Sequence, residues 1–361
     1  MLAFACPVCA RLVTFESSVC LHCGSQLGYE PARRTIVALS DGADQPRAGA
    51  PGAGEPLADD AGDAGPASRC ANADLAACNW VVRREGEPCA SCVLTRVRPN
   101  DADADGLGGF ATAEAAKRRL LFELADLGLP IVGWHERPGG LAFELLSSRH
   151  APVSTGHADG VITLDLDETD PAHRERMRVS LGEPYRTVLG HFRHEIGHYY
   201  QPILIAPDSA PEQRCRELFG DDREDYQRAL ERYYQEGAPA GWEERFVSAY
   251  ATMHPWEDWA ETFSHYLHIQ DTVQTAASYG VRVEGPSIAT ADPLPLHASP
   301  KDAPEDIHSV LAAWIPLTYA LNAISRSMGA PDLYPFVLTA EIEAKLAFID
   351  ALVRDGSGSH R

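Results

Sequence analysis

The sequence predicts an α+β protein, with a small β-rich N-terminal domain followed by a larger, mainly α-helical domain. Two observations support this division. Eight of the nine cysteines lie within residues 6–92, so the N-terminal part has the composition of a small cysteine-rich domain. Strand candidates end at residue 166, and from about residue 171 onward the spacing of apolar residues is helical.

The boundaries of the domains follow from local composition. Residues 40–68 are rich in Ala, Gly, Pro and Asp and predict a flexible insertion in the first domain. The stretch "RPNDADADGLGG" is rich in turn-forming residues and predicts a solvated linker, because its aspartates do not complete a calcium-binding loop. The expected segments are a first domain at 1–99, a linker at 100–111, a second domain at 112–354 and a flexible tail at 355–361.

Composition and charge exclude several classes of function. A hydrophobic content of 45% and a charged content of 23% are those of a globular protein. The net charge is −21, which argues against nucleic acid as the main ligand. We expect no membrane span, because no run of about 20 apolar residues is evident. The N-terminal stretch "MLAFACPVC" lacks the charged region of a secretory signal, so we expect a cytoplasmic protein with reduced thiols.

The first group of cysteines has the spacing of a zinc ribbon. Cys6 and Cys9 form one C-x2-C pair, and Cys20 and Cys23 form a second pair after ten intervening residues. Thiolates from two tight turns can complete a tetrahedral zinc site, and Gly24 permits the left-handed turn after the second pair. The alternative is free or disulfide-bonded thiols. The sequence therefore predicts a zinc-ribbon domain.

The second group consists of Cys70, Cys78, Cys89 and Cys92. Only the last two form a tight pair, so Cys70 and Cys78 need a small loop to converge with them. We expect a second structural zinc ion there, because four reduced cysteines in one small domain commonly bind metal. Cys215 stands alone and is interpreted as a packed or surface thiol.

Five segments of the second domain have recognisable patterns. A helix is expected between the capping residue Thr112 and Gly128, and a closing helix over 339–353. Between them, strand candidates cover residues 131–135, 141–146 and 161–166.

The stretch "HFRHEIGHYY" (191–200) contains an H-E-x-x-H motif formed by His194, Glu195 and His198. On a helix, residues four apart share one face, so both imidazoles can bind one metal ion while Glu195 reaches a water on that ion. Glu183 and Pro184 suit the start of this helix, and Gly190 and Gly197 indicate close packing along it. The alternative is a chance match in a histidine-rich helix. A catalytic zinc requires a third protein ligand, so finding one would favour the metal site over the chance match.

The stretch "HPWEDWAETFSHYLHI" (254–269) offers the best candidates for that ligand, because Glu257, Glu261 and His265 share one helix face. "AETFSH" is similar to the second motif of gluzincin peptidases. This resemblance implies that Glu261 is the ligand, with Glu257 as the alternate. His265 stands where an acid that orients the first histidine is expected, and Asp258 is an alternative for that role.

A wider resemblance covers nearly the whole chain. The sequence is similar to the bacterial putative zinc-binding metallopeptidase family with an N-terminal zinc-ribbon domain. Gln201 departs from the family, whose members tend to have Trp after the Tyr pair. The resemblance implies a zincin-like metallopeptidase domain at 112–354. It rests on the motifs "CPVC…FESSVCLHCGSQLGY", "CAN…CNW", "CASC", "GEPYRTVLGHFRHEIGHYY", "LFGDDREDYQRALERYY" and "ERFVSAYATMHPWEDWAETFSHYLHI".

The expected activity is zinc-dependent hydrolysis of peptide bonds by metal-activated water, with Glu195 as general base. Tyr250 and His254 are candidate donors to the oxyanion, against the alternative of a packed tyrosine and a surface histidine. Tyr199 and Tyr200 are expected to pack the helix that carries the motif. The last strand before this helix is expected to be an edge strand that binds substrate by strand addition.

The expected zinc content is three ions, one catalytic and two structural. Expected partners are a peptide or protein substrate and a protein that contacts the zinc ribbon, without strong binding to nucleic acid or membranes. The alternative function is an adaptor or sensor whose H-E-x-x-H core does not hydrolyse peptides. A non-peptide amidase is a further alternative.

Overall fold

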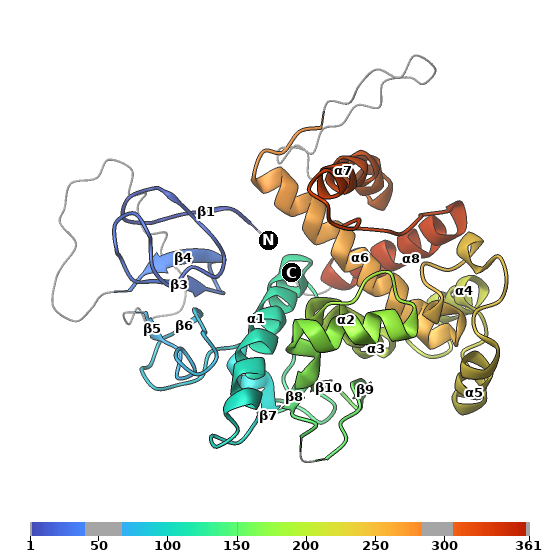
Figure 1. Cartoon of the computed structure of the whole chain (residues 1–361), viewed down its shortest axis with the longest axis horizontal. Helices are drawn as coiled ribbons and strands as arrows, with labels where there is room; N and C mark the ends of the chain where they lie inside the picture. Colours follow the sequence, from blue (N-terminus) through green and yellow to red (C-terminus); the bar gives the residue numbers. More distant parts are fainter. Residues whose placement is uncertain (1, 40–66, 150, 284–305, 359–361) are drawn as a thin grey trace. The chain divides into compact units, whose positions relative to one another are not determined.

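The computed structural model describes residues 2–39, 67–149, 151–283 and 306–358, which form two compact units (Figure 1). The first unit is Leu2–Val93 and the second begins at Leu94. This division lies six residues before the boundary expected from composition. Most of the insertion expected at 40–68 lies outside the described residues.

The first unit is built from short antiparallel strand pairs, β1 with β2, β3 with β4 and β5 with β6. Such short ladders bury little apolar area. Their core is therefore aromatic: Tyr29 lies with its ring centroid 4.8 Å from that of Phe15 and 5.3 Å from that of Trp80. The strands are β1 (Phe4–Ala5), β2 (Leu12–Val13), β3 (Leu27–Glu30), β4 (Thr35–Ala38), β5 (Ser68–Arg69) and β6 (Val81–Val82).

The second unit contains a four-stranded sheet in the order β7-β8-β10-β9. Its strands are β7 (Thr95–Val97), β8 (Ala142–Leu146), β9 (Gly156–Ala158) and β10 (Val161–Asp165). β7, β8 and β10 are parallel, whereas β9 pairs antiparallel with β10 and forms the edge.

Two expectations about strands are therefore wrong. Residues 131–135 form only an isolated bridge between Gly133 and Leu141. The last strand before the motif helix, β10, is internal, because the short β9, which precedes it in the chain, pairs antiparallel with its outer side. β9 has only three residues and no alternating apolar pattern, so its sequence gave no signal.

Eight α-helices are described in the second unit, and side chains cap most of their N-termini. They are α1 (Ala104–Asp126), α2 (Pro171–Leu181), α3 (Val188–Leu204), α4 (Ala210–Phe219), α5 (Tyr226–Glu236), α6 (Pro255–Ser278), α7 (Ile307–Ser327) and α8 (Ala340–Gly358).

Three helix ends differ from expectation. α1 begins in the expected linker, because the Asp103 carboxylate accepts a hydrogen bond from Gly106 N–H and caps the helix there rather than at Thr112. α3 begins after Thr187, whose hydroxyl accepts from Gly190 N–H, and not at Pro184. α8 continues to Gly358, into the expected tail.

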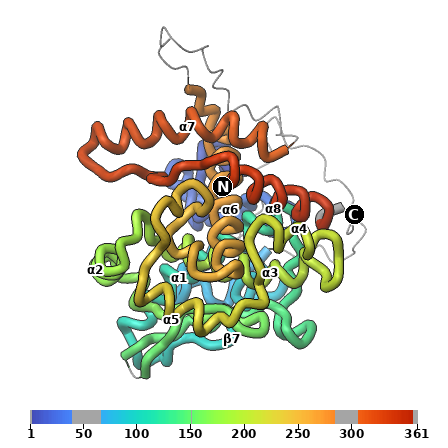
Figure 2. The backbone as a smooth tube through the Cα atoms, turned by 90° about the vertical axis from the view of Figure 1, so that its right-hand side faces the viewer, coloured from blue at the N-terminus to red at the C-terminus, as the bar shows by residue number. Residues whose placement is uncertain are grey.

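The core of the second unit is centred on α3 and α6, which pack closely against one another. A β-carbon at Gly197 would lie 3.0 Å from Ala260 Cα and 3.2 Å from Phe263 Cβ, so only glycine permits this approach. The buried indole of Trp259 donates to the Gly197 carbonyl at 2.9 Å. α7 and α8 pack against α6 and against each other (Figures 1 and 2). The two helices that carry the candidate ligands therefore hold each other in place.

α7 is the one described helix that is long and apolar enough to cross a membrane by length and composition. This result differs from the expectation, because the helix mixes apolar residues with Ser, Thr and Asn and so contains no uninterrupted apolar run. Trp314 and Leu317 are buried against the rest of the unit. A core helix of a soluble protein passes the same test, so this is weak evidence for a membrane span.

Candidate metal sites and active site

The first four cysteines converge as expected. Cys6 Sγ lies 3.7 Å from Cys23 Sγ, and Cys9 Sγ lies 3.6 Å from Cys20 Sγ. Sulfurs at the corners of a tetrahedron around zinc, with Zn–S bonds of about 2.3 Å, lie roughly 3.8 Å apart. The four sulfurs therefore have the spacing that a tetrahedral zinc ion requires.

The two knuckles of this site have the same backbone geometry. Ala10 N–H donates to the Cys6 carbonyl at 2.9 Å, and Gly24 N–H donates to the Cys20 carbonyl at 2.8 Å. Both residues after the knuckles have left-handed backbones, with φ of +56° at Ala10 and +74° at Gly24. Glycine adopts this conformation without strain, whereas alanine does not. The first knuckle is consequently the more strained of the two.

The second four cysteines also form one cluster. Cys78 Sγ lies 3.6 Å from Cys89 Sγ and 3.7 Å from Cys92 Sγ. Cys70 Sγ joins them and accepts a hydrogen bond from Cys89 N–H at 3.2 Å, which stabilises a thiolate. Cys215 belongs to neither cluster and is buried in α4, as expected.

The H-E-x-x-H motif lies on α3 with both histidines on one face. The Nε2 atoms of His194 and His198 are 3.2 Å apart. One ligand atom from each of His194, Glu195 and His198 lies within 4.8 Å of the others. The arrangement expected from helical spacing is therefore present.

Glu257, from α6, completes this arrangement. Its Oε2 atom lies 3.0 Å from His194 Nε2 and 3.5 Å from His198 Nε2. Nitrogen and oxygen ligands about 2.0–2.2 Å from a tetrahedral zinc lie roughly 3.3 Å from each other. Glu257 Oε2 is buried and has no partner of acceptable hydrogen-bond geometry among the described residues, while Oε1 accepts from the Tyr226 hydroxyl at 2.9 Å. The three atoms fit three corners of a zinc site, and an ion there would give the buried oxygen a partner.

Glu261 lies on the other side of His194. The His194 Nδ1–H donates to Glu261 Oε1 at 2.7 Å. Burial alone would raise the pKa of Glu261, but the contact with His194 outweighs burial and lowers it. An ionised carboxylate on Nδ1 fixes the tautomer that presents a free Nε2 to a metal.

The positions of the two glutamates bear on which of them is the ligand. The resemblance to gluzincins implied Glu261 as ligand, but the geometry favours the alternate, Glu257. The reason is the contact of α6 with Gly197 of α3. This contact places the N-terminal turn of α6, with Glu257, against the Nε2 atoms of both histidines.

These observations agree with the comparisons to known proteins. Residues 107–352 match the family described as "putative zinc-binding metallo-peptidase", and residues 3–103 match a zinc-ribbon domain. The chain belongs to this metallopeptidase family. It is 49% identical over 353 residues to uncharacterized proteins of Mycobacterium bovis and of Mycobacterium tuberculosis strain H37Rv, covering 97% of this chain and 94% of each relative. No solved structure matches the chain.

Neither residue expected to orient His194 does so in this member of the family. His265 Nδ1 is hydrogen-bonded to the Tyr334 hydroxyl at 2.7 Å. Asp258 accepts from Lys345 Nζ at 2.7 Å. Burial raises the pKa of Asp258 to about 7, although Lys345 opposes this shift. Glu261, rather than His265 or the alternative Asp258, contacts Nδ1 of His194.

The two candidate oxyanion donors have different surroundings. The Tyr250 ring centroid lies 6.0 Å from that of His194, and Tyr250 lines the cleft beside Glu195. His254 is buried at the start of α6, where Nδ1 accepts from Trp256 N–H at 3.1 Å and Nε2 lies 3.1 Å from the Glu224 carbonyl. Both imidazole nitrogens of His254 are thus occupied by backbone. We retain Tyr250 as a candidate and not His254, which caps the helix.

Two residues of the site were not expected from the sequence. Tyr226, on α5, supports Glu257 through its hydroxyl. His157, on β9, lies nearly parallel to His198, with ring centroids 6.4 Å apart. Burial lowers the pKa of His157 to about 4, so it is neutral near pH 7. His157 belongs to none of the motifs, whereas Tyr226 lies in the stretch "LFGDDREDYQRALERYY", which by itself indicated no role in the site. Tyr199 and Tyr200 are buried along α3, as expected.

The cleft has two cavities that meet at the motif, one of about 620 Å³ and one of about 580 Å³. Both are lined by His194, Glu195 and Tyr250, and by Thr155 at the start of the β9 edge. We call them the proline-rich cavity, which contains Pro202, Pro207 and Pro255, and the aromatic cavity, which contains Tyr185, Tyr233 and Phe336.

Proposed function

We propose that the protein hydrolyses peptide bonds with a zinc ion held by His194, His198 and Glu257. The observation that carries this proposal is the spacing of their three ligand atoms, together with the buried and otherwise unpaired Oε2 of Glu257. Family membership supports the class of enzyme. A third protein ligand beside an accessible cleft is the arrangement of catalytic rather than structural zinc.

Zinc bound there would lower the pKa of a water molecule and polarise the scissile carbonyl. Glu195 lines both cavities and is positioned to accept the proton of that water and then to donate it to the leaving amine. Burial raises the pKa of Tyr250, so its hydroxyl remains protonated near pH 7 and can donate to the developing oxyanion. Glu261 holds the proton on His194 Nδ1.

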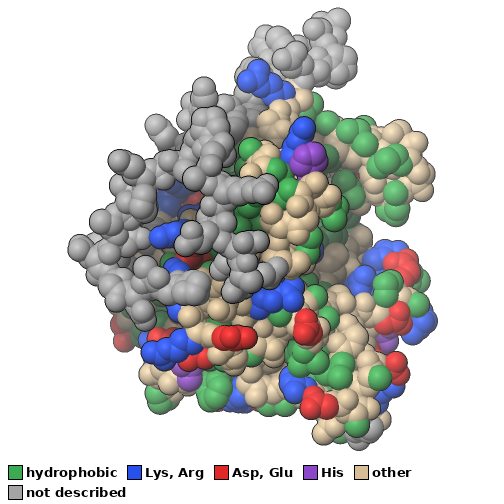
Figure 3. All heavy atoms as spheres, turned by 90° about the vertical axis from the view of Figure 1, so that its left-hand side faces the viewer, with side chains coloured by type: hydrophobic (Ala, Val, Ile, Leu, Met, Phe, Trp, Pro, Cys, Tyr) green, Lys and Arg blue, Asp and Glu red, His purple; other side chains and the backbone are tan. Residues whose placement is uncertain are grey.

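The same proposal includes two structural zinc ions, one in each cysteine cluster, and a cytoplasmic location. The spacing of the sulfurs supports the ions, and clusters of reduced cysteines are typical of a reducing compartment. Binding to nucleic acid is not part of the proposal. On the face shown in Figure 3, basic and acidic side chains of the described residues are interspersed rather than gathered into a basic area.

Cleavage of a peptide library by the zinc-loaded protein tests the activity. We expect wild type to cleave and Glu195→Gln to lose cleavage while keeping its zinc, because the base is removed and the ligands are not. Glu231→Gln is the matched control, since Glu231 is exposed on α5 and lies in neither cavity. Cleavage by Glu195→Gln at the wild-type rate would exclude Glu195 as the base.

A second candidate function is an adaptor that binds a protein through the zinc ribbon. The observation that favours it is the exposure of apolar side chains at both knuckle tips, 54% for Val8 and 100% for Leu21. It requires no hydrolysis. Absence of cleavage by the fully zinc-loaded wild type would support it over the peptidase.

A further inference from the structure

The wall of the aromatic cavity is formed largely by aromatic and imidazole rings. Besides His191, His194 and Tyr250, six rings line it, and several are packed against one another. His265 lies 4.4 Å from Phe336 between ring centroids, and Tyr185 lies 5.5 Å from His268. Burial lowers the pKa of His265 to about 4, so that ring is uncharged near pH 7. The rings are those of Tyr185, Tyr233, Tyr234, His265, His268 and Phe336.

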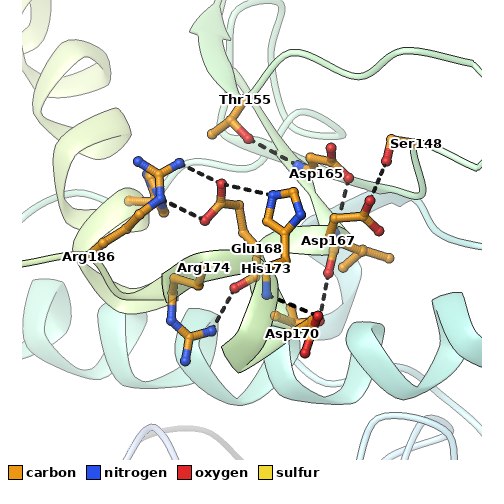
Figure 4. A network of polar contacts seen from close by, with 12 residues as sticks. Ser148, Thr155, Asp165, Asp167, Glu168, Asp170, His173, Arg174 and Arg186 are labelled. Carbon is orange, nitrogen blue, oxygen red and sulfur yellow. Dashed lines mark hydrogen bonds and ion pairs between the residues drawn. The ribbon is translucent and has the colours of Figure 1, made fainter. Parts of the chain in front are cut away.

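The charged groups of this cavity already have partners. Arg186 Nη1 lies 2.9 Å from both carboxylate oxygens of Glu183, and its Nε donates to Glu168 at 3.0 Å (Figure 4). His191 Nε2 lies 3.3 Å from Glu168, and Glu261 is bound to His194. Apart from Glu195, each charged side chain of the described wall thus already has a hydrogen-bond or ion-pair partner. A charged substrate side chain would lose hydration there without gaining an ion pair.

The described lining of the proline-rich cavity likewise contains no free cation. Arg216 is its only described Lys or Arg, and it is held by Glu212 at 2.8 Å and by Asp222 at 2.8 Å. A carboxypeptidase needs a cation for the terminal carboxylate of its substrate, and an aminopeptidase needs a carboxylate for the terminal amine. In this cavity, Glu212 and Asp222 both accept hydrogen bonds from Arg216. The cleft continues on both sides of Glu195, so substrate residues can extend in both directions.

We propose that the cleft takes an internal segment of a peptide, with a large aromatic side chain next to the scissile bond in the aromatic cavity. This inference rests on the proposed peptidase function. A cavity of about 580 Å³ is large enough for a tyrosine or tryptophan side chain, and offset or edge-on ring contacts favour an aromatic group over an aliphatic one. Among the described strands, β9 pairs on one side only, and its other edge can align an extended segment.

The test uses peptides with acetylated N-termini and amidated C-termini that differ at one position on each side of the scissile bond. Phe or Tyr at one of these positions should raise kcat/KM roughly tenfold or more over Lys or Asp. Phe336→Ala should reduce this preference while zinc content stays unchanged. Tyr319→Ala is the control, because Tyr319 is 74% exposed on α7 and lines neither cavity. Tyr234→Ala serves if Phe336→Ala does not fold, since Tyr234 is 68% exposed.

Equal rates for Phe, Lys and Asp, or cleavage only of peptides with a free terminus, would overturn the inference and leave the peptidase function intact. If zinc-loaded wild type cleaves no peptide, the proposed function fails instead. The subsite is then decided by calorimetric binding of the same blocked peptides to Glu195→Gln. Tighter binding of the Phe peptide than of the Lys peptide supports the aromatic cavity, and equal binding contradicts it.

Discussion

The cysteine clusters and the α3–α6 site differ in how the protein positions their candidate metal ligands. In the first unit, four sulfurs surround each site, and the strands between them are mostly two residues long. In the second unit, two long helices packed through Gly197 bring His194, His198 and Glu257 together. Besides its cysteines, the first unit has only a small core around Tyr29, whereas the second has a large aromatic core.

This difference is the one between a structural metal site, which stabilises its domain, and a catalytic metal site, which is held by a domain that is already folded. A closed four-sulfur site has no position for substrate, and its binding energy serves folding. A three-ligand site on helices that already pack against each other is preorganised, and its fourth position remains for chemistry. The two units should therefore respond differently to loss of metal.

Removal of zinc should have the largest effect. A strong chelator should unfold Leu2–Val93, because structural zinc contributes about 10–16 kcal/mol in small zinc domains. α3 and α6 should remain folded. Hydrogen exchange followed by mass spectrometry of the full chain reports on both units at once.

Cysteine substitutions provide the matched control for this experiment. Cys78→Ser should release one zinc ion and destabilise the first unit, whereas Cys215→Ser should retain all zinc, because Cys215 belongs to no cluster. Slow exchange in the first unit after zinc removal would contradict the contrast between the two units.

Gly197→Ala should have a smaller effect, confined to the second unit. A methyl group there would lie 3.0 Å from Ala260 Cα and push α3 away from α6, at a cost of about 1–3 kcal/mol. Gly108→Ala, in α1, has no atom within 4 Å and should stabilise by about 0.5–1 kcal/mol. Denaturant unfolding followed by far-UV circular dichroism measures both. Equal midpoints for the two variants would show that the α3–α6 contact is not tight.

The smallest effect is expected at the first knuckle. Ala10→Gly should relieve the left-handed backbone at φ +56° and strengthen zinc retention by about 1 kcal/mol. Gly24→Ala should weaken it by a similar amount, because φ is +74° there. Competition with a chromogenic chelator gives both values. A shift of the same sign in both variants would contradict the comparison of the knuckles.

Much of the fold could be predicted because its signals are local. C-x2-C spacing indicated the zinc ribbon, and i, i+4 histidines indicated the face of α3. β9 was not predicted, because a strand of three residues has no recognisable periodic pattern. The start of α1 was not predicted either, because three glycines follow Asp103 and made a helix there unexpected.

The choice between Glu257 and Glu261 could not be made from sequence for a different reason. Both residues lie on one face of α6, so helical spacing permits either. Which of the two glutamates faces the histidine Nε2 atoms depends on where α6 contacts α3. This contact is a tertiary property set by Gly197 and Ala260. His254 likewise needed the structure, because its partners at Glu224 and Trp256 are backbone groups that no motif reveals.

The most direct test of the account is the zinc content of Glu257→Ala, Glu261→Ala and Glu195→Gln, measured by elemental analysis after equal dialysis. Glu257→Ala should lose the zinc ion of the α3–α6 site and retain about two per chain, because a ligand is removed. Glu261→Ala should keep three at saturating zinc but bind the third about 10–100-fold more weakly, and Glu195→Gln should keep three. Loss of the third zinc from Glu261→Ala, together with its full retention by Glu257→Ala, would contradict the assignment of Glu257 as the ligand.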